Sequence, residues 1–245
     1  MIVTTCMSRL QHLRCTLPLM AEHDEVVVCC YHDAVAARYV RELEHPRVRC
    51  VQVAGNGAFH KARALNVGAD AAIRGGGVVL NAIDERVERL LFLDADTRIA
   101  DPDAFEQWYS EAVQDPDHFH ICLRDNEWYQ SWDLSGVLLV SVEHFLASGG
   151  YEEAIRGWGI DDLELRMKLA IKCGLPWKNI PHELFKPIPH GDNLRVQNYG
   201  EKNKDRSNAR NAQILARNIQ AWTGGKRLQE LDGKYRPLLS TIDRK

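Results

Sequence analysis

The chain lacks the features that mark membrane-spanning, secreted disulfide-rich and disordered proteins. No stretch approaches the roughly 18 consecutive apolar residues of a membrane-spanning helix. The first residues, MIVTTCMSRLQHL, have no basic segment followed by a long apolar one, which argues against a signal peptide and predicts a cytoplasmic protein. With 245 residues, 45% apolar and 27% charged, the composition is that of an ordinary globular protein with a sizeable core.

Paired cysteine motifs are also missing. The seven cysteines are odd in number and show no C-x-x-C spacing, which excludes zinc-ribbon and thioredoxin-type sites. Cys29 and Cys30 lie inside the apolar stretch EVVVCCY, where thiols usually serve as small core side chains. We therefore expect free thiols in a reducing compartment.

The net charge of −3 conceals an uneven distribution. From residue 195 to residue 245 there are 12 Lys and Arg against 5 Asp and Glu, so the acidic excess lies in the rest of the chain. A basic segment on an acidic body is typical of proteins with an anionic partner, such as phosphate, nucleic acid or an acidic membrane surface. An exposed basic helix without a partner explains the pattern equally well.

The first hundred residues alternate between strand-like and helix-like segments. We predict strands at 1–6, 25–31, 48–54 and 89–97, and helices at 8–20 (ending near Pro18), 34–44 and 58–73. This order predicts an α/β protein with a mostly parallel sheet flanked by helices.

The second half continues with a helix at 101–113, capped by Asp101, and a strand at 135–141. A further helix is predicted from Asp161 to Cys173, where Gly174 and Pro176 end it. Residues 201–222 are helical and polar, which indicates a C-terminal extension rather than a second domain.

Two carboxylates follow the apolar strand LLFL, at Asp94 and Asp96. Ligands of open α/β sheets bind at the carboxyl ends of strands, and paired carboxylates there suit a divalent cation that also binds phosphate. A strand-end turn with solvated acids is an equally good explanation. Asp94 to Thr97 also resembles the D-x-D-x-T motif of haloacid-dehalogenase-type phosphatases, although Thr97 falls one position early and three strands precede the motif.

A second group of residues runs from Gly157 to Glu164 with the sequence GWGIDDLE. Glycines allow close approach to a ligand, and Trp158 offers a flat ring on which a sugar can stack. Asp161 and Asp162 then open a helix, where helix capping alone would explain one of them.

A third group is the segment PHGDN at residues 189–193. His190 could complete a metal site begun by carboxylates, and His182 is the competing candidate.

The order of these motifs resembles GT-A nucleotide-sugar glycosyltransferases, and most of all the group of β-1,4-galactosyltransferases, chondroitin polymerases and polypeptide N-acetylgalactosaminyltransferases. Residues 5–13 resemble the first strand of this group and its R-x-x-H-L turn, and residues 59–68 are similar to its F-N-R-A-K-L-L-N-V-G segment. Residues 92–96 match its D-x-D strand, and residues 145–164 resemble its F-L-x-x-x-G…G-W-G-x-E-D-D-D block.

The resemblance covers about residues 1–200. It implies a GT-A domain with a nucleotide-binding half at about 1–100 and an acceptor and catalytic half at about 101–200. Residues 201–245 would then form the basic helical extension.

The resemblance also implies a role for each matching residue. The donor nucleotide would be bound by Thr5, Arg9, Phe59, Lys61, Asn66 and Asp94. A Mn²⁺ or Mg²⁺ ion would be bound by Asp94, Asp96 and His190. The acceptor and the donor sugar would contact Trp158, Gly159, Asp161 and Trp132. Asp162 would be the catalytic base of an inverting transfer, because the dipole of the helix that it opens keeps it ionised.

Some positions depart from the group's pattern. Pro187 stands where the galactosyltransferases have a metal-binding Met, and only Asp33 could take the place of the uracil-binding Asp. Trp128, Tyr129 and Trp132 are candidates both for sugar stacking and for the core. The donor sugar, the acceptor and the linkage therefore stay open.

We expect a UDP-sugar donor and a carbohydrate, lipid-linked or peptide acceptor, with no nucleic acid. Arg195, Lys202 and Lys204 are candidate phosphate clamps in a lid segment, or residues of an exposed polar loop. The basic C-terminal segment could contact an anionic membrane. The alternatives are a haloacid-dehalogenase-type phosphatase and a non-catalytic nucleotide-sugar-binding module.

Overall fold

The β-branched stretch predicted at 25–31 forms an interior strand of the main sheet. β2 (Val26–Tyr31) is buried along its whole length and pairs in parallel with β1 (Ile2–Cys6) and β3 (Val48–Val53). A strand covered on both faces needs apolar side chains at successive positions rather than at alternate ones. The sequence VVVCCY meets this requirement.

The computed structural model describes residues 1–75, 87–123, 134–190, 196–227, 230–231, 233–235 and 238. Its main sheet has the strand order β3-β2-β1-β4-β7-β6-β8. The remaining strands of this sheet are β4 (Arg89–Phe92), β6 (Phe119–Cys122), β7 (Leu138–Ser141) and β8 (Trp177–Ile180). β7 runs antiparallel to both of its neighbours, whereas the other pairings are parallel. The predicted α/β class with a mostly parallel sheet is confirmed.

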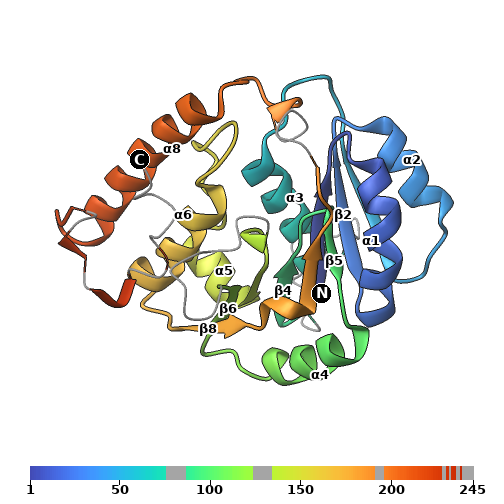
Figure 1. The fold of residues 1–245 in the computed structure, drawn as a ribbon, viewed down its shortest axis with the longest axis horizontal. Coiled ribbons are helices and arrows are strands. Elements are labelled where there is room, and N and C mark those ends of the chain that lie inside the picture. Colours follow the sequence, from blue (N-terminus) through green and yellow to red (C-terminus); the bar gives the residue numbers. More distant parts are fainter. Residues whose placement is uncertain are drawn as a thin grey trace.

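Helices cover both faces of the sheet (Figure 1). One core contains side chains of α1 (Leu10–His23), α2 (Ala34–Glu42) and α4 (Pro102–Val113). The opposite core contains side chains of α3 (Lys61–Ile73), α5 (Val142–Ser148), α6 (Asp161–Met167) and α8 (Lys204–Trp222). A π-helical segment, Lys168–Lys172, continues α6. Short 3-10 helices lie at His182–Leu184 and Gly233–Tyr235.

The first helix does not end near Pro18, as the sequence suggested, but continues to His23. Pro18 lies on the exposed side of α1, while Leu13, Leu17 and Met20 pack into the core. Burial of that apolar face offsets the cost of a proline in the helix, which is about 3 kcal/mol.

Short elements of the second half escaped the sequence analysis. They include β6, β8, α5 and a two-stranded sheet in which β5 (Thr97–Ile99) pairs antiparallel with β9 (Phe185–Pro187). β5 follows the Asp94–Asp96 turn, and β9 leads into His190. Their pairing brings two chain segments that are some 90 residues apart to the same end of the main sheet.

Candidate functional site

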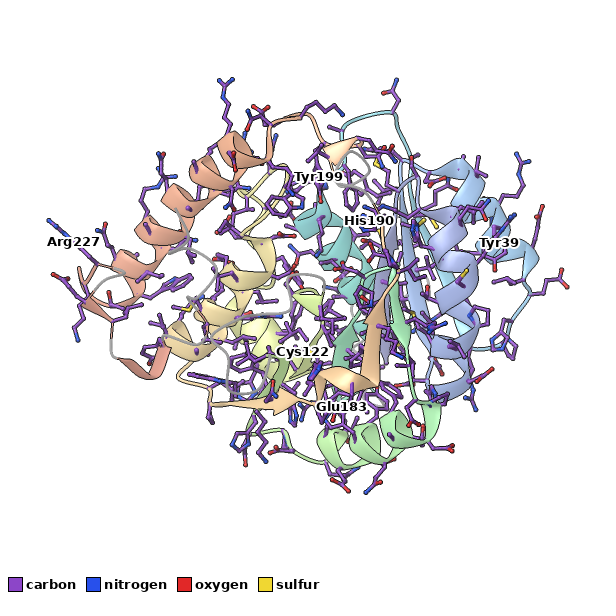
Figure 2. The ribbon with its side chains drawn as sticks, viewed as in Figure 1. Tyr39, Cys122, Glu183, His190, Tyr199 and Arg227 are labelled. Carbon is purple, nitrogen blue, oxygen red and sulfur yellow. The ribbon has the colours of Figure 1, made fainter. Side chains whose placement is uncertain are left out.

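The cavity of interest lies where β1 and β4 end and where the 185–190 segment crosses them. It has a volume of about 340 Å³. Residues predicted for the site that line it are Thr5, Arg9, Phe59, Lys61, Asp94, Asp96, Trp158, Gly159, Asp161, Asp162 and His190. Figure 2 shows His190 and Tyr199 at this end of the sheet, with Glu183 toward the opposite end.

The Asp94–Asp96 turn carries two carboxylates with different partners. Asp94 lies 3.0 Å from the Nζ atom of Lys61. Asp96 accepts a hydrogen bond from Arg9 at 2.7 Å, and the Nε2 atom of His190 lies 2.6 Å from the same oxygen. The turn therefore joins the strand ends of the first half to the 185–190 segment of the second.

Lys61 lies among three carboxylates. Its Nζ atom is 2.9 Å from Asp162, 3.0 Å from Asp94 and 3.8 Å from Asp161. Burial acts to lower the pKa of Lys61, but the surrounding carboxylates raise it well above its ordinary value. Lys61 is therefore a fixed cation that links the Asp94–Asp96 turn to the start of α6.

Asp162 begins α6 together with Asp161, as predicted. Burial raises the pKa of Asp162 to about 7, against the opposing charge of Lys61, and the carboxylates of Asp161 and Asp94 add to the increase. A carboxylate with a pKa near neutral pH can both accept and release a proton under ordinary conditions, as a general base must.

The predicted metal ligands are brought together in part. Asp96 and His190 meet at 2.6 Å and are mostly buried, and a carboxylate and an imidazole are donors that Mn²⁺ accepts. Asp94 lines the same cavity but pairs with Lys61. Among the described residues, no group of three His, Cys, Asp or Glu side chains is spaced to hold a metal. Of the predicted set, Asp96 and His190 are therefore the two residues whose positions and chemistry suit such an ion.

The Gly-Trp-Gly loop follows a left-handed path into α6. Gly157, Gly159 and Ile160 have φ angles of 82°, 87° and 76°. Glycine adopts this region without strain, whereas Ile160 does so at a cost of about 1–2 kcal/mol. The Nζ atom of Lys204 lies 4.5 Å from the centre of the Trp158 ring, so a cation covers part of the ring on which we expected a sugar.

The sequence is similar to galactosyltransferases. The family described as the N-terminal domain of galactosyltransferase matches residues 117–190. Human beta-1,4-galactosyltransferase 3 is 25% identical over an alignment of 185 residues, gaps included, that covers 69% of this chain and 44% of the human protein. The chain thus spans less than half the length of this relative.

Solved structures resemble nearly the whole chain in fold. The mannosyltransferase PcManGT from Pyrobaculum calidifontis, in complex with GDP-Man and Mn²⁺, is similar with a TM-score of 0.59 and 18% identity over 97% of this chain and 67% of that one. GalNAc-T7 with UDP, GalNAc and Mn²⁺ is similar with a TM-score of 0.56 and 11% identity over 98% and 53%. The chain has the GT-A fold.

Five residues singled out in the sequence lie outside the cavity lining or outside the described residues. Asn66 is not among the residues that line the cavity. Its amide donates to the carbonyl of Tyr151 at 3.0 Å and accepts from the N–H of Tyr151 at 2.9 Å, which ties α3 to the 149–153 turn. Trp132 and Arg195 lie outside the described residues, as do Trp128 and Tyr129.

Asp33 and Lys202 have partners that differ from those expected. Asp33 caps α2 through the N–H of Ala36 and accepts from the N–H of Ser8 at 2.7 Å. Lys202 donates to the main-chain carbonyl of Val196 at 3.3 Å. Neither residue is among the described residues that line the cavity.

The sequence analysis missed residues of the 196–208 segment. Tyr199 is buried, lines the cavity and packs its ring against Phe59, with ring centres 5.4 Å apart. Burial and the nearby Asp161 hold the pKa of Tyr199 far above its usual range. Asn198 donates to the carbonyl of Met7 at 3.0 Å, and Asn208 also lines the cavity. No periodicity marks these residues, because they belong to irregular backbone and to the first turns of α8.

None of the helices in the described part of this GT-A chain combines the length and the apolar character needed to cross a membrane.

Proposed function

We propose that this protein is a metal-dependent, inverting glycosyltransferase that transfers a sugar from a UDP-sugar to an acceptor hydroxyl. One observation carries the proposal: Asp94, Asp96 and His190 share a single cavity with Asp162, in a chain with the GT-A fold. The transfer needs these two kinds of group next to each other, since one side must bind a diphosphate and the other must remove a proton.

The donor side consists of the residues at the ends of β1 and β4. Asp94, Asp96 and His190 would hold a Mn²⁺ or Mg²⁺ ion, which stabilises the charge of a departing diphosphate. Arg9 and Lys61 supply fixed positive charge at the same place. Thr5, Phe59 and Tyr199 line the cavity and would contact the nucleoside. The mannosyltransferase PcManGT was solved with GDP-Man, so a guanine nucleotide is the natural competitor of UDP in a test.

The acceptor side consists of the Gly-Trp-Gly loop and the start of α6. Trp158, Gly159 and Asp161 would contact the acceptor and the donor sugar. Asp162 would take the proton from the acceptor hydroxyl as its oxygen forms a bond with the anomeric carbon. The bond from that carbon to the diphosphate breaks on the opposite face, and the leaving oxygen keeps the electron pair. Displacement from the opposite face inverts the anomeric configuration.

The class of acceptor is a carbohydrate, a lipid-linked sugar or a peptide. The position of Trp158 at the cavity wall supports a sugar acceptor, because sugars present flat apolar faces to aromatic rings. Transfer from each UDP-sugar to a set of monosaccharide acceptors would identify the preferred pair.

The decisive experiment compares thermal stabilisation by UDP, GDP, CDP and dTDP, each with Mn²⁺, with Mg²⁺ and with EDTA. A nucleotide present at about 100 times its dissociation constant stabilises the folded state by about 2.7 kcal/mol. We expect a UDP-dependent shift that disappears with EDTA and is absent from a His190→Ala variant. His182→Ala is the matched control, since His182 is exposed and is not among the described residues that line the cavity.

Failure of every nucleotide to stabilise the protein would refute the proposed donor site. Hydrolysis of a phosphate ester in place of sugar transfer would support the haloacid-dehalogenase-type alternative. Binding of a nucleotide sugar without any turnover would support the non-catalytic module.

A further inference from the structure

The C-terminal helix α8 carries buried polar side chains on the face that it turns toward the rest of the protein. Ser207 and Asn211 have no solvent-exposed surface, and they lie one turn apart, followed on the same face by Leu215 and Ile219. Polar groups buried in this way are costly unless their hydrogen bonds are made. Their partners therefore indicate what the helix is for.

Apart from Arg210, which donates to the Oδ1 atom of Asn211 at 3.5 Å, these partners belong to the loop that precedes Asp161. The amide of Asn211 donates to the carbonyls of Arg156 and Gly159, each at 3.0 Å, and to the carbonyl of Trp158 at 3.4 Å. The hydroxyl of Ser207 accepts a hydrogen bond from the N–H of Trp158 at 2.9 Å. Two side chains of one helix thus engage four main-chain groups of the Gly-Trp-Gly loop.

The close contact between α8 and the loop requires the two glycines of the loop. A β-carbon on Gly157 would overlap the hydroxyl of Ser207, and one on Gly159 would lie 2.7 Å from the Oδ1 atom of Asn208. Their positive φ angles add a second reason for glycine. The two glycines therefore allow α8 to pack closely against the loop, and Gly159 also lines the cavity.

The same helix also contacts α6. The amide of Asn218 donates to a carboxylate oxygen of Glu164 at 3.0 Å, and Glu164 is fully buried two residues after Asp162. Lys168 lies 3.2 Å from the other oxygen of Glu164. α8 therefore makes polar contacts with the loop before the proposed base and with the helix after it.

We propose that Ser207 and Asn211 are positioning residues for acceptor binding. They fix the backbone of residues 156–159, and thereby hold Trp158 at the wall of the cavity and hold the left-handed turn at Ile160 that aims α6 and Asp162. The inference rests on the proposed function for its kinetic part. Its structural part concerns the loop alone and does not depend on any activity.

The test uses Ser207→Ala and Asn211→Leu, which remove the hydrogen bonds with little change of size. Gln213→Ala, on the exposed side of α8, controls for the helix. Ile219→Val, on the buried face of α8 and distant from the loop in the chain, controls for lost packing in the core. Each variant is characterised by its thermal midpoint, by amide hydrogen exchange of residues 156–160, and by the KM values for acceptor and donor.

We expect Asn211→Leu to raise the acceptor KM about 10- to 100-fold, since small misplacements of a binding group have effects of this size, and Ser207→Ala to raise it by less. The donor KM and UDP affinity should not change, and the amide of Trp158 should exchange faster in both variants. Ile219→Val should lower the thermal midpoint without changing the acceptor KM or the exchange of Trp158.

An unchanged exchange rate at Trp158 in both variants would overturn the proposal. So would an equal rise of the acceptor KM in Ile219→Val, because loss of packing would then explain the effect. If the wild-type protein transfers no sugar at all, the proposed function fails, and the exchange data alone decide whether α8 holds the loop.

Discussion

The two halves of the site are built in different ways. In the first hundred residues, most of the site side chains lie at strand ends, with Thr5 in β1, Arg9 just beyond it, and Asp94 and Asp96 just after β4, while Lys61 begins α3. In the second half they lie on loops and helix starts, and α8 and the 185–190 segment hold them through contacts with distant parts of the chain. Strand ends place most of the proposed donor groups, with His190 as the exception, whereas long-range side-chain contacts place the proposed acceptor groups.

This difference teaches where each half is vulnerable. A strand end is fixed by a hydrogen-bonded ladder to its neighbours, so a single substitution there removes one group and leaves the others in place. A loop held by a few buried side chains moves as a unit when one of them is lost. Substitutions in the two halves should therefore produce different kinds of defect.

The largest effect is expected for Asp162→Asn, in the second half. Loss of the base should lower kcat about 100- to 10,000-fold, because general-base catalysis contributes rate factors of that size. UDP binding, measured by titration calorimetry, should remain because the strand-end groups are untouched. Asp103→Asn, at the exposed first turn of α4, is the matched control. Full activity of Asp162→Asn would show that another group is the base.

A buried histidine of the second half should make the stability of the protein depend on pH. Burial lowers the pKa of His120 in β6 to about 4, helped by Arg89 and opposed by Asp115. The unfolded chain binds a proton at His120 below about pH 6.5 while the folded chain does not, so stability falls from pH 6.5 to about 4, by up to roughly 3 kcal/mol.

Urea unfolding at several pH values would test this slope. His120→Gln should flatten the fall in stability between pH 6.5 and 4, whereas His182→Gln, at an exposed position, should preserve it. An identical slope in the wild type and His120→Gln would assign the acid sensitivity to other groups.

Gly136 is a point where the two halves touch. A β-carbon at this position would overlap the carboxylate of Asp94. We expect Gly136→Ala to displace Asp94 and to cost about 1–3 kcal/mol of stability, the usual penalty of overpacking. Metal-dependent stabilisation by UDP should weaken at the same time. Gly233→Ala, with open space around the position, should leave both properties unchanged.

The smallest effect on ligand binding is expected for Asn66→Ala, in α3. The side chain bonds the main chain of Tyr151 twice, so its loss should cost about 1–3 kcal/mol of stability through an unpaired buried group. UDP affinity should stay the same, since Asn66 is not among the cavity-lining residues. A loss of UDP affinity in a stably folded Asn66→Ala protein would instead support the donor-binding role that the resemblance implied.

Much of the first half was predictable because its signals are local. The β-branched runs and helical spacings predicted the strands and helices of the first half, and Asp101 predicted the cap of α4. The continuation of α1 past Pro18 was not predictable, because the packing of Leu13, Leu17 and Met20 on the sheet decided it. The short strands β5, β6, β8 and β9 carry too few residues for a periodic pattern.

The candidate site was predicted as a set of residues but not as an arrangement. Motif order identified Asp94, Asp96, Asp162 and His190, and the fold brings all of them to one cavity. No sequence pattern predicts three of the contacts. Lys61 lies among three carboxylates, Tyr199 packs against Phe59, and Ser207 bonds the Gly-Trp-Gly loop. Each of these contacts joins segments that are distant in the chain.

The sequence by itself determined the α/β class, the parallel first half and the residue types that can bind a diphosphate and remove a proton. Periodicity and turn chemistry depend on neighbouring residues, so a single chain records them directly. Only the tertiary structure decided that α8 bonds the Gly-Trp-Gly loop and that Lys61 links both halves. Such contacts depend on how the sheet brings distant segments together, and the cost of leaving buried polar groups unpaired then fixes which side chains meet.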